Sequence, residues 1–134
     1  MEIKLPTKQK IAKTAKEFNL KLVLLFGSRV SGKTHKESDV DLAFLSEKEL
    51  SFEEEILLNT KFCGLFRTDR VDTVNLKKAP PLLAKQIISN YKILYEKKAG
   101  TLNRLSIYIY RKYFESEPLF KLVDERLKSF VSKK

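Results

Sequence analysis

The sequence has one cysteine, one histidine and no uninterrupted apolar run that approaches the length of a membrane span. The single thiol, Cys63, excludes an internal disulfide framework and fits a reducing compartment. A structural zinc site is also excluded, because no second cysteine or further histidine stands at ligand spacing. The first ten residues lack the apolar core of a signal peptide. We therefore expect a cytoplasmic protein without a membrane partner.

Positive charge, by contrast, is plentiful. The 134 residues include 27 Lys or Arg and 17 Asp or Glu, which gives a formal net charge of +10. The hydrophobic fraction of 43% is too high for a disordered basic tail, and the length suits one domain, which we expect to span residues 1–134. A strongly basic domain points to an anionic partner, which can be a nucleotide, a nucleic acid or an acidic protein surface.

Hydrophobic periodicity predicts a mixed α/β (α+β) fold with a sheet of about four strands covered by helices. Ser51 followed by Glu54 forms a capping box that opens one helix, and the helix that begins at Pro80 and Pro81 is expected to bury Leu82, Leu83, Ile87 and Ile88. We expect a catalytic core over about 20–96 and a helical part over about 101–132. The expected order is helix 6–18, strand 21–26, strand 39–45, a helix from 51, strand 70–76, a helix from 80, strand 91–95, a helix after Gly100 and a last helix from Ser116 and Pro118.

One motif matches a well-known pattern in the wrong context. Residues 27–34 satisfy G-x-x-x-x-G-K-[ST], the phosphate-binding loop of many ATPases and GTPases. That loop must be followed by a long helix whose N-terminus holds the phosphates. Only residues 35–38 separate Thr34 from the next predicted strand, which is about one helical turn. The sequence therefore argues against such a nucleotide site.

The same region contains a pair of acids on a predicted strand. Asp39 and Asp41 stand two residues apart, so their side chains share one face, roughly 6–7 Å apart along the backbone. Two such carboxylates repel each other unless a cation lies between them, and their oxygens suit Mg²⁺. Asp72 can join the pair if strand 70–76 lies beside strand 39–45. The alternative for Asp72 is a plain ion pair with Arg70.

Residues next to the acids are suited to phosphate. Gly27 follows a predicted strand and lets the backbone approach a phosphate group, and Ser28 offers a hydroxyl and an N–H. Arg29 and Lys33 can balance phosphate charge. His35, the only histidine, is interpreted as a solvated loop residue.

These residues carry a family resemblance. Gly27-Ser28, a ten-residue spacer and Asp39-x-Asp41 resemble the signature of the polymerase-beta-type nucleotidyltransferases. Phe26–Arg29 and Ser38–Leu42 resemble the smallest branch of that family, the minimal nucleotidyltransferases (MNT). The resemblance is close over residues 22–45 and looser through residues 70–76 and 93–96, so it spans most of the chain.

The resemblance implies a set of roles. Asp39, Asp41 and Asp72 would be the catalytic residues and bind Mg²⁺, with two ions expected, while Gly27, Ser28 and Arg29 would bind the nucleotide, with ATP as substrate. Many minimal nucleotidyltransferases are antitoxins that transfer AMP to a tyrosine of a HEPN-domain ribonuclease toxin. The resemblance therefore implies a HEPN-type toxin as partner in a hetero-oligomer.

Two other functions remain open from the sequence. The chain could act as a non-catalytic antitoxin that only docks on its toxin, or it could transfer a nucleotide to a small molecule or to RNA. No RNA-binding module is visible, so no stable nucleic-acid complex is expected. Tyr108, Tyr110, Tyr113 and Phe114 crowd one predicted helix, which can be core or a partner interface.

Overall fold

The computed structural model of the protein describes residues 5–27, 39–115 and 125–130. Its elements follow the predicted order: α1 (Lys8–Glu17), β1 (Leu20–Phe26), β2 (Val40–Ser46), α3 (Phe52–Phe66), β3 (Val71–Asn75), α4 (Pro81–Ser89), β4 (Tyr91–Glu96) and α5 (Thr101–Glu115). Residues 125–130 are also helical, whereas the predicted start of the last helix at Ser116 and Pro118 lies outside the described residues. Among the helices described, none combines the length and the apolar composition needed to traverse a bilayer.

Two helices begin where side chains satisfy the first backbone amides. At the start of α3 the Ser51 N–H donates to Glu54 Oε1 over 3.0 Å, and the Glu54 N–H donates to Ser51 Oγ over 3.1 Å. This reciprocal pair is the predicted capping box. At the start of α1 the hydroxyl oxygen of Thr7, the residue after Pro6, accepts from the Lys10 N–H over 3.3 Å. Both helix starts are thus determined by local sequence.

The four strands form one mixed sheet in the order β3-β2-β1-β4. The central strand β1 pairs antiparallel with both β2 and β4, while β2 and β3 are parallel and joined through α3. Every residue of β1 except Lys21 is buried, as the nearly continuous apolar run of this segment predicts. The predicted mixed sheet is confirmed.

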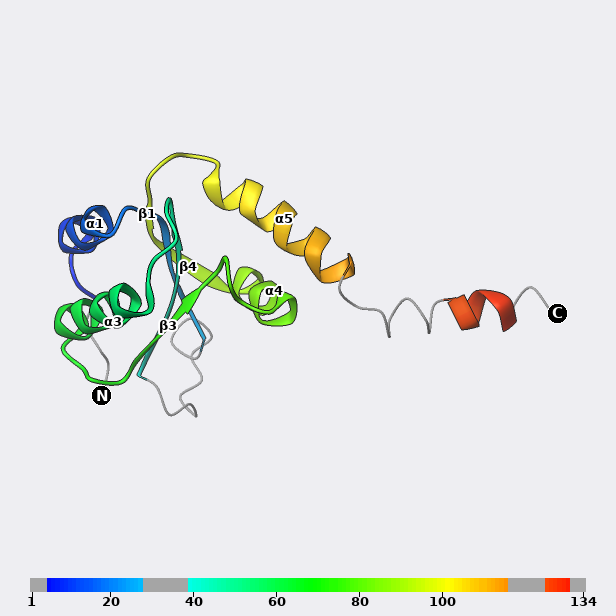
Figure 1. Ribbon diagram of the computed structural model, residues 1–134, viewed down its shortest axis with the longest axis horizontal. Helices are drawn as coiled ribbons and strands as arrows, with labels where there is room; N and C mark the ends of the chain where they lie inside the picture. The colour runs from blue at the N-terminus through cyan, green and yellow to red at the C-terminus, as the bar shows by residue number, and fades with distance from the viewer. Residues whose placement is uncertain (1–4, 28–38, 116–124, 131–134) are drawn as a thin grey trace.

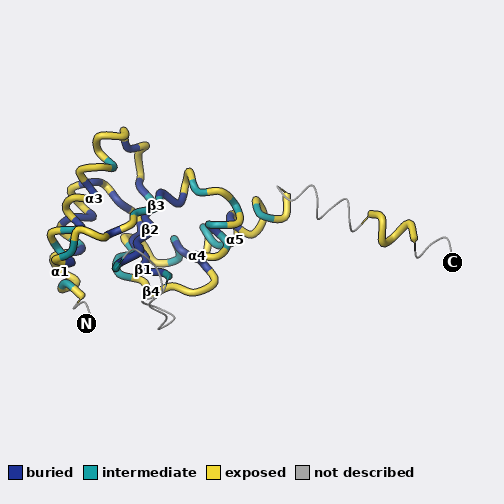
Figure 2. The backbone as a smooth tube through the Cα atoms, turned by 90° about the horizontal axis from the view of Figure 1, so that it is seen from below, coloured by how far each residue is buried: buried dark blue, intermediate teal, exposed yellow. Residues whose placement is uncertain are grey.

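Alternation along the strands divides the core into two layers, one on each face of the sheet. The first face packs against α1 and α3, and the second face packs against α4 and α5, as Figure 1 shows. On β2, Val40 and Leu42 belong to the first face and Ala43 to the second. The two central strands β1 and β2 are the most buried part of the molecule, whereas the first half of β4 is exposed (Figure 2). Side chains at alternate positions along a strand therefore pack against different helical layers.

One core prediction is wrong. In α4, Ile87 and Ile88 are buried as expected, but 51% of Leu82 is exposed. Ala84 is buried in its place and packs with Ile88 toward α5. Because Ala84 and Ile88 are four residues apart, they share a helix face, whereas Leu82 lies about 200° around the helix from Ala84.

Candidate active site

The sheet register places two of the predicted acids, Asp41 and Asp72, side by side at the end of the sheet where β1 ends. Phe26, the last residue of β1, pairs with Asp41 of β2, and Asp41 pairs with Asp72 of β3. On β2, Val40 and Leu42 lie in the first-face core, so Asp41 between them faces the second face. Paired residues on neighbouring strands point to the same side, so Asp72 faces the same way. Strand β3 thus lies beside β2, which is the condition under which Asp72 can join the acid pair.

Burial differs sharply between the three acids. Only 4% of Asp41 is exposed, the side chain of Asp39 is 33% exposed, and Asp72 is exposed. Neighbouring strands are separated by about 4.8 Å, so the Asp41 and Asp72 backbones are one strand spacing apart. The acidic side chains therefore range from buried, at Asp41 on β2, to solvent-exposed, at Asp72 on β3.

Gly27 is fixed next to Asp41 by its own geometry. Its φ is +82°, a left-handed conformation that favours glycine. A Cβ atom built at Gly27 would lie 2.4 Å from Oδ2 of Asp41, well inside contact distance. The glycine therefore brings the backbone at the end of β1 against the buried carboxylate.

Asp39 is held by residues from the turn before β3. The hydroxyl of Thr68 donates to Asp39 Oδ2 over 2.7 Å, and Arg70 Nη1 lies 3.9 Å from Asp39 Oδ1. The Asp39 N–H also donates to the carbonyl oxygen of Arg70 over 2.8 Å. Arg70 thus forms its ion pair with Asp39, not the one with Asp72 that the sequence left open. Thr68 was not predicted, because no local pattern connects two residues 29 positions apart.

The carboxylates of these acids are the type of ligand that binds Mg²⁺, although they do not by themselves complete its coordination. No group of three or more His, Cys, Asp or Glu side chains is arranged to hold a metal ion within the described parts of the chain. Mg²⁺, however, is usually held by one or two carboxylates together with substrate phosphates and water. Asp41 with Asp39 or with Asp72 supplies that number of carboxylates. The donor set is thus compatible with a metal that arrives with a nucleotide.

Ser28 and Arg29 lie outside the described residues, as do Lys33 and His35. Gly27 is the last described residue before them and Asp39 the first after them. The described part of the site therefore consists of residues at the end of β1 and at the starts of β2 and β3.

Comparison with known proteins agrees with this arrangement. The family model "Polymerase beta, Nucleotidyltransferase" matches residues 9–100. Among curated proteins, the protein adenylyltransferase MntA of Shewanella oneidensis is 34% identical over 76 residues, which cover 57% of this chain and 54% of that protein. The MntA adenylyltransferase of Aphanizomenon flos-aquae is 25% identical over 123 residues, covering 85% of this chain and 82% of that protein. The chain thus matches about half the length of the first relative and most of the second.

Solved structures share the fold. A toxin–antitoxin structure with AMP-PNP superposes with a TM-score of 0.72 at 24% identity, covering 91% of this chain and 98% of that one. The structure of a tri-AMPylated Shewanella oneidensis HEPN toxin in complex with MNT antitoxin gives a TM-score of 0.68 at 23% identity, covering 90% and 95%. At this identity the likeness concerns the fold alone. The family match, which spans both the acid pair and Asp72, places this chain in the polymerase beta nucleotidyltransferase family.

Proposed function

We propose that the protein is a Mg²⁺-dependent nucleotidyltransferase that moves AMP from ATP to a tyrosine hydroxyl of a HEPN-type ribonuclease toxin and so acts as its antitoxin. The observation that carries the proposal is the pairing of Asp41 with Asp72 on one sheet face beside Gly27. The relatives named protein adenylyltransferase, and the AMPylated toxin in a structure of the same fold, support the choice of reaction and partner. A cytoplasmic location belongs to the same proposal.

Each residue has a defined task in this reaction. Asp39 and Asp41 would hold Mg²⁺, with Asp72 completing the site, and the metal would neutralise phosphate charge and orient the reacting oxygens. Gly27 would admit the triphosphate to the end of β1, where Ser28 and Arg29 would contact its oxygens. Thr68 and Arg70 fix the orientation of Asp39.

The chemistry needs no protein nucleophile. The acceptor hydroxyl oxygen attacks the α-phosphorus, the bond from that phosphorus to the bridging oxygen breaks, and diphosphate leaves. The hydroxyl proton passes to Asp72, which is the exposed acid and hence the one an incoming tyrosine can reach. The products are AMP joined to the acceptor oxygen and diphosphate.

Asp41→Asn tests this assignment. The purified chain is incubated with ATP, Mg²⁺ and the protein encoded beside it, and intact mass is measured for additions of one AMP unit. Replacing a direct metal ligand is expected to lower the transfer rate by more than about 100-fold, because even residues that merely support metal ligands contribute 10–100-fold. Asp69→Asn removes an equivalent charge from an exposed aspartate in the turn before β3 and should leave the rate unchanged.

A second candidate is an antitoxin that acts by docking. It is favoured by α5, which extends past α4 in Figure 1 and exposes Ile107, Tyr108 and Phe114 by 61%, 56% and 56%. If Asp41→Asn still binds and silences the toxin completely without any mass addition, docking explains inhibition. AMP found on RNA or a small molecule instead would retain the chemistry and replace the acceptor.

A further inference from the structure

A basic pocket lies at the end of the sheet opposite the acids. Its volume is about 520 Å³, and its walls come from the start of β1, the end of β2, the turn after β4 and the first turns of α5. Lys21 lines the pocket, six residues before Gly27 on the same strand. At about 3.3 Å per residue, roughly 20 Å of strand separate this pocket from the acids. The pocket is therefore not part of the candidate active site.

Positive charge dominates the lining. Four of its side chains are cationic: Lys21, Lys97, Lys98 and Arg104. Among the described residues, Glu47 is the only acid that lines the pocket, and it forms an ion pair with Lys97. The hydrogen bond from Lys97 lowers the pKa of Glu47, and the same contact raises the pKa of Lys97. The charges of Glu47 and Lys97 offset each other. For the three other cations, Lys21, Lys98 and Arg104, no ion pair is seen with any described residue.

Hydrogen bonds order the backbone around these cations. The Lys97 N–H donates to the Lys21 carbonyl oxygen over 2.9 Å, which ties the turn after β4 to β1. The Thr101 hydroxyl donates to the Lys98 carbonyl oxygen over 2.7 Å. Gly100 has a φ of +89°, and a Cβ there would lie 3.0 Å from Arg104 Nη1, so the guanidinium lies against the glycine backbone. The backbone that carries these cations is thus ordered, with Lys97 and Lys98 in the turn after β4, Lys21 on β1 and Arg104 on α5.

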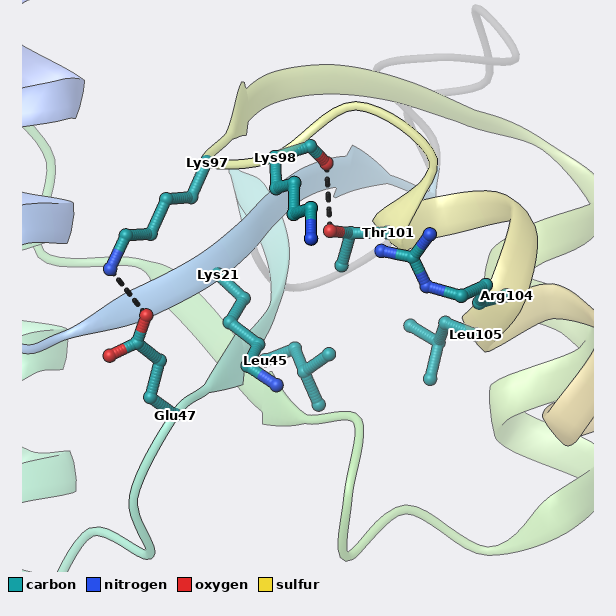
Figure 3. A pocket seen from close by; sticks show the side chains of 8 residues that line it. All are labelled: Lys21, Leu45, Glu47, Lys97, Lys98, Thr101, Arg104 and Leu105. Carbon is teal, nitrogen blue, oxygen red and sulfur yellow. Dashed lines mark hydrogen bonds and ion pairs between the residues drawn. The ribbon is translucent and has the colours of Figure 1, made fainter.

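The charge comes from side chains rather than from the N-terminus of α5. The Leu102 N–H of that first turn already donates to Glu96 Oε2 over 2.9 Å. Figure 3 shows Lys98 and Arg104 on one side of the pocket, with Leu45 and Leu105 below them and Lys97 turned away toward Glu47. The pocket therefore combines a cationic side with an apolar wall.

We propose that this pocket binds a nucleoside phosphate at a second site, separate from the acids. Lys98 in the turn after β4 and Arg104 on α5 lie on one side of the pocket, so a phosphate group bound there would offset their repulsion, and Lys21 on β1 adds to the positive charge of the lining. Leu45 and Leu105 offer an apolar surface to the base or ribose. The volume lies within the range of about 300–1,000 Å³ that small-molecule sites occupy. The inference does not depend on the proposed transferase activity.

Titration of ¹⁵N-labelled protein with ADP in the absence of Mg²⁺ tests the proposal. The amide signals of residues 97–105 should move and saturate as a group of their own. Lys98→Gln/Arg104→Gln should weaken binding measured at those signals at least tenfold, and Lys21→Gln should weaken it from an independent strand. Lys61→Gln removes an exposed charge from α3 and should leave binding unchanged. Signals of Gly27 and Val40–Leu42 report separately on the acid end.

Each other outcome overturns the proposal. Signals of residues 97–105 that stay still at millimolar ADP, or that move equally in the double variant, remove the second site. Inorganic diphosphate binding as tightly as ADP removes the nucleoside from the ligand, because the apolar wall would then contribute nothing. Single-stranded RNA binding at these signals where ADP does not bind would make the pocket a nucleic-acid contact instead.

Discussion

At the scale of single residues, the acid end depends on a contact that only glycine permits. Gly27 combines a left-handed φ with an approach to Asp41 that leaves no room for a Cβ atom. A second glycine, Gly64 in α3, meets neither restriction, because nothing lies within 4 Å of the position of its missing Cβ. The two glycines therefore form a matched pair with opposite expectations.

Gly27→Ala is expected to lower the free energy of unfolding by about 1–3 kcal/mol, the cost of forcing a side chain into a disfavoured backbone conformation. Gly64→Ala should raise it by up to about 1 kcal/mol, since alanine is the better residue within a helix. Urea denaturation followed by circular dichroism measures both. Equal effects from the two substitutions would show that Gly27 does not need its left-handed conformation.

How far the sequence predicts this site depends on the distance between the interacting residues. The capping box at Ser51 and the Asp39-x-Asp41 spacing are local, so pattern alone identified them. The pairing of Asp41 with Asp72 depends on β2 and β3 being neighbours in the sheet, an arrangement that the sequence pattern permits but does not require. The bond from Thr68 to Asp39 could not be predicted, because it arises only when the turn before β3 folds beside β2.

At the scale of elements, the ends of β2 and β4 are connected by an ion pair. Glu47 follows β2, Lys97 follows β4, and β1 lies between the two strands. The Glu47 N–H also donates to the Asn19 carbonyl oxygen over 2.8 Å, just before β1. The pair thus joins the outer strand β4 to the inner sheet across β1.

The pH dependence of this pair follows from its two pKa shifts. Because the pKa of Glu47 is lowered on folding, its contribution is present above the usual value of 4.5 and is lost as the pH falls through the folded value. Because the pKa of Lys97 is raised, its contribution is present below 10.5 and is lost as the pH rises through the folded value. Glu47→Gln should therefore reduce stability between these limits.

Thermal unfolding of wild-type and Glu47→Gln protein at a series of pH values checks this expectation. The difference in stability should be largest near neutral pH and shrink toward both extremes. Added salt should reduce it as well, because the pair lies at the surface. A difference that keeps its size at pH 3 would mean that the side-chain amide disturbs something other than the charge pair.

At the scale of the whole molecule, stability rests on two helical layers around one sheet. In α3 the side chain of Phe62 is fully buried in the first-face core, while 74% of Phe52 is exposed. The same helix therefore offers the same substitution in the core and in solvent. Because domains are stable by only about 5–15 kcal/mol, losing the packing of one core side chain measurably shifts the whole unfolding transition.

Phe62→Ala is expected to cost about 3–5 kcal/mol, the usual range for removing a buried aromatic ring. Phe52→Ala should change stability by no more than about 0.5 kcal/mol. Denaturant unfolding monitored by circular dichroism compares the two variants with the wild type, and Phe62→Leu provides a milder core change should the alanine variant not fold. A large loss from Phe52→Ala would indicate that α3 buries a different face.

The pairing of Asp41 with Asp72 has a consequence for how this chain can vary in length. Strand parity sends Val40 and Leu42 into the first-face core and Asp41 to the opposite side. Insertion or deletion of one residue within β2 would reverse that assignment, placing a carboxylate under α3 and apolar side chains at the acid end. Changes of length in related proteins should therefore fall in the turns between strands, and β2 should keep a constant length wherever the acids are retained.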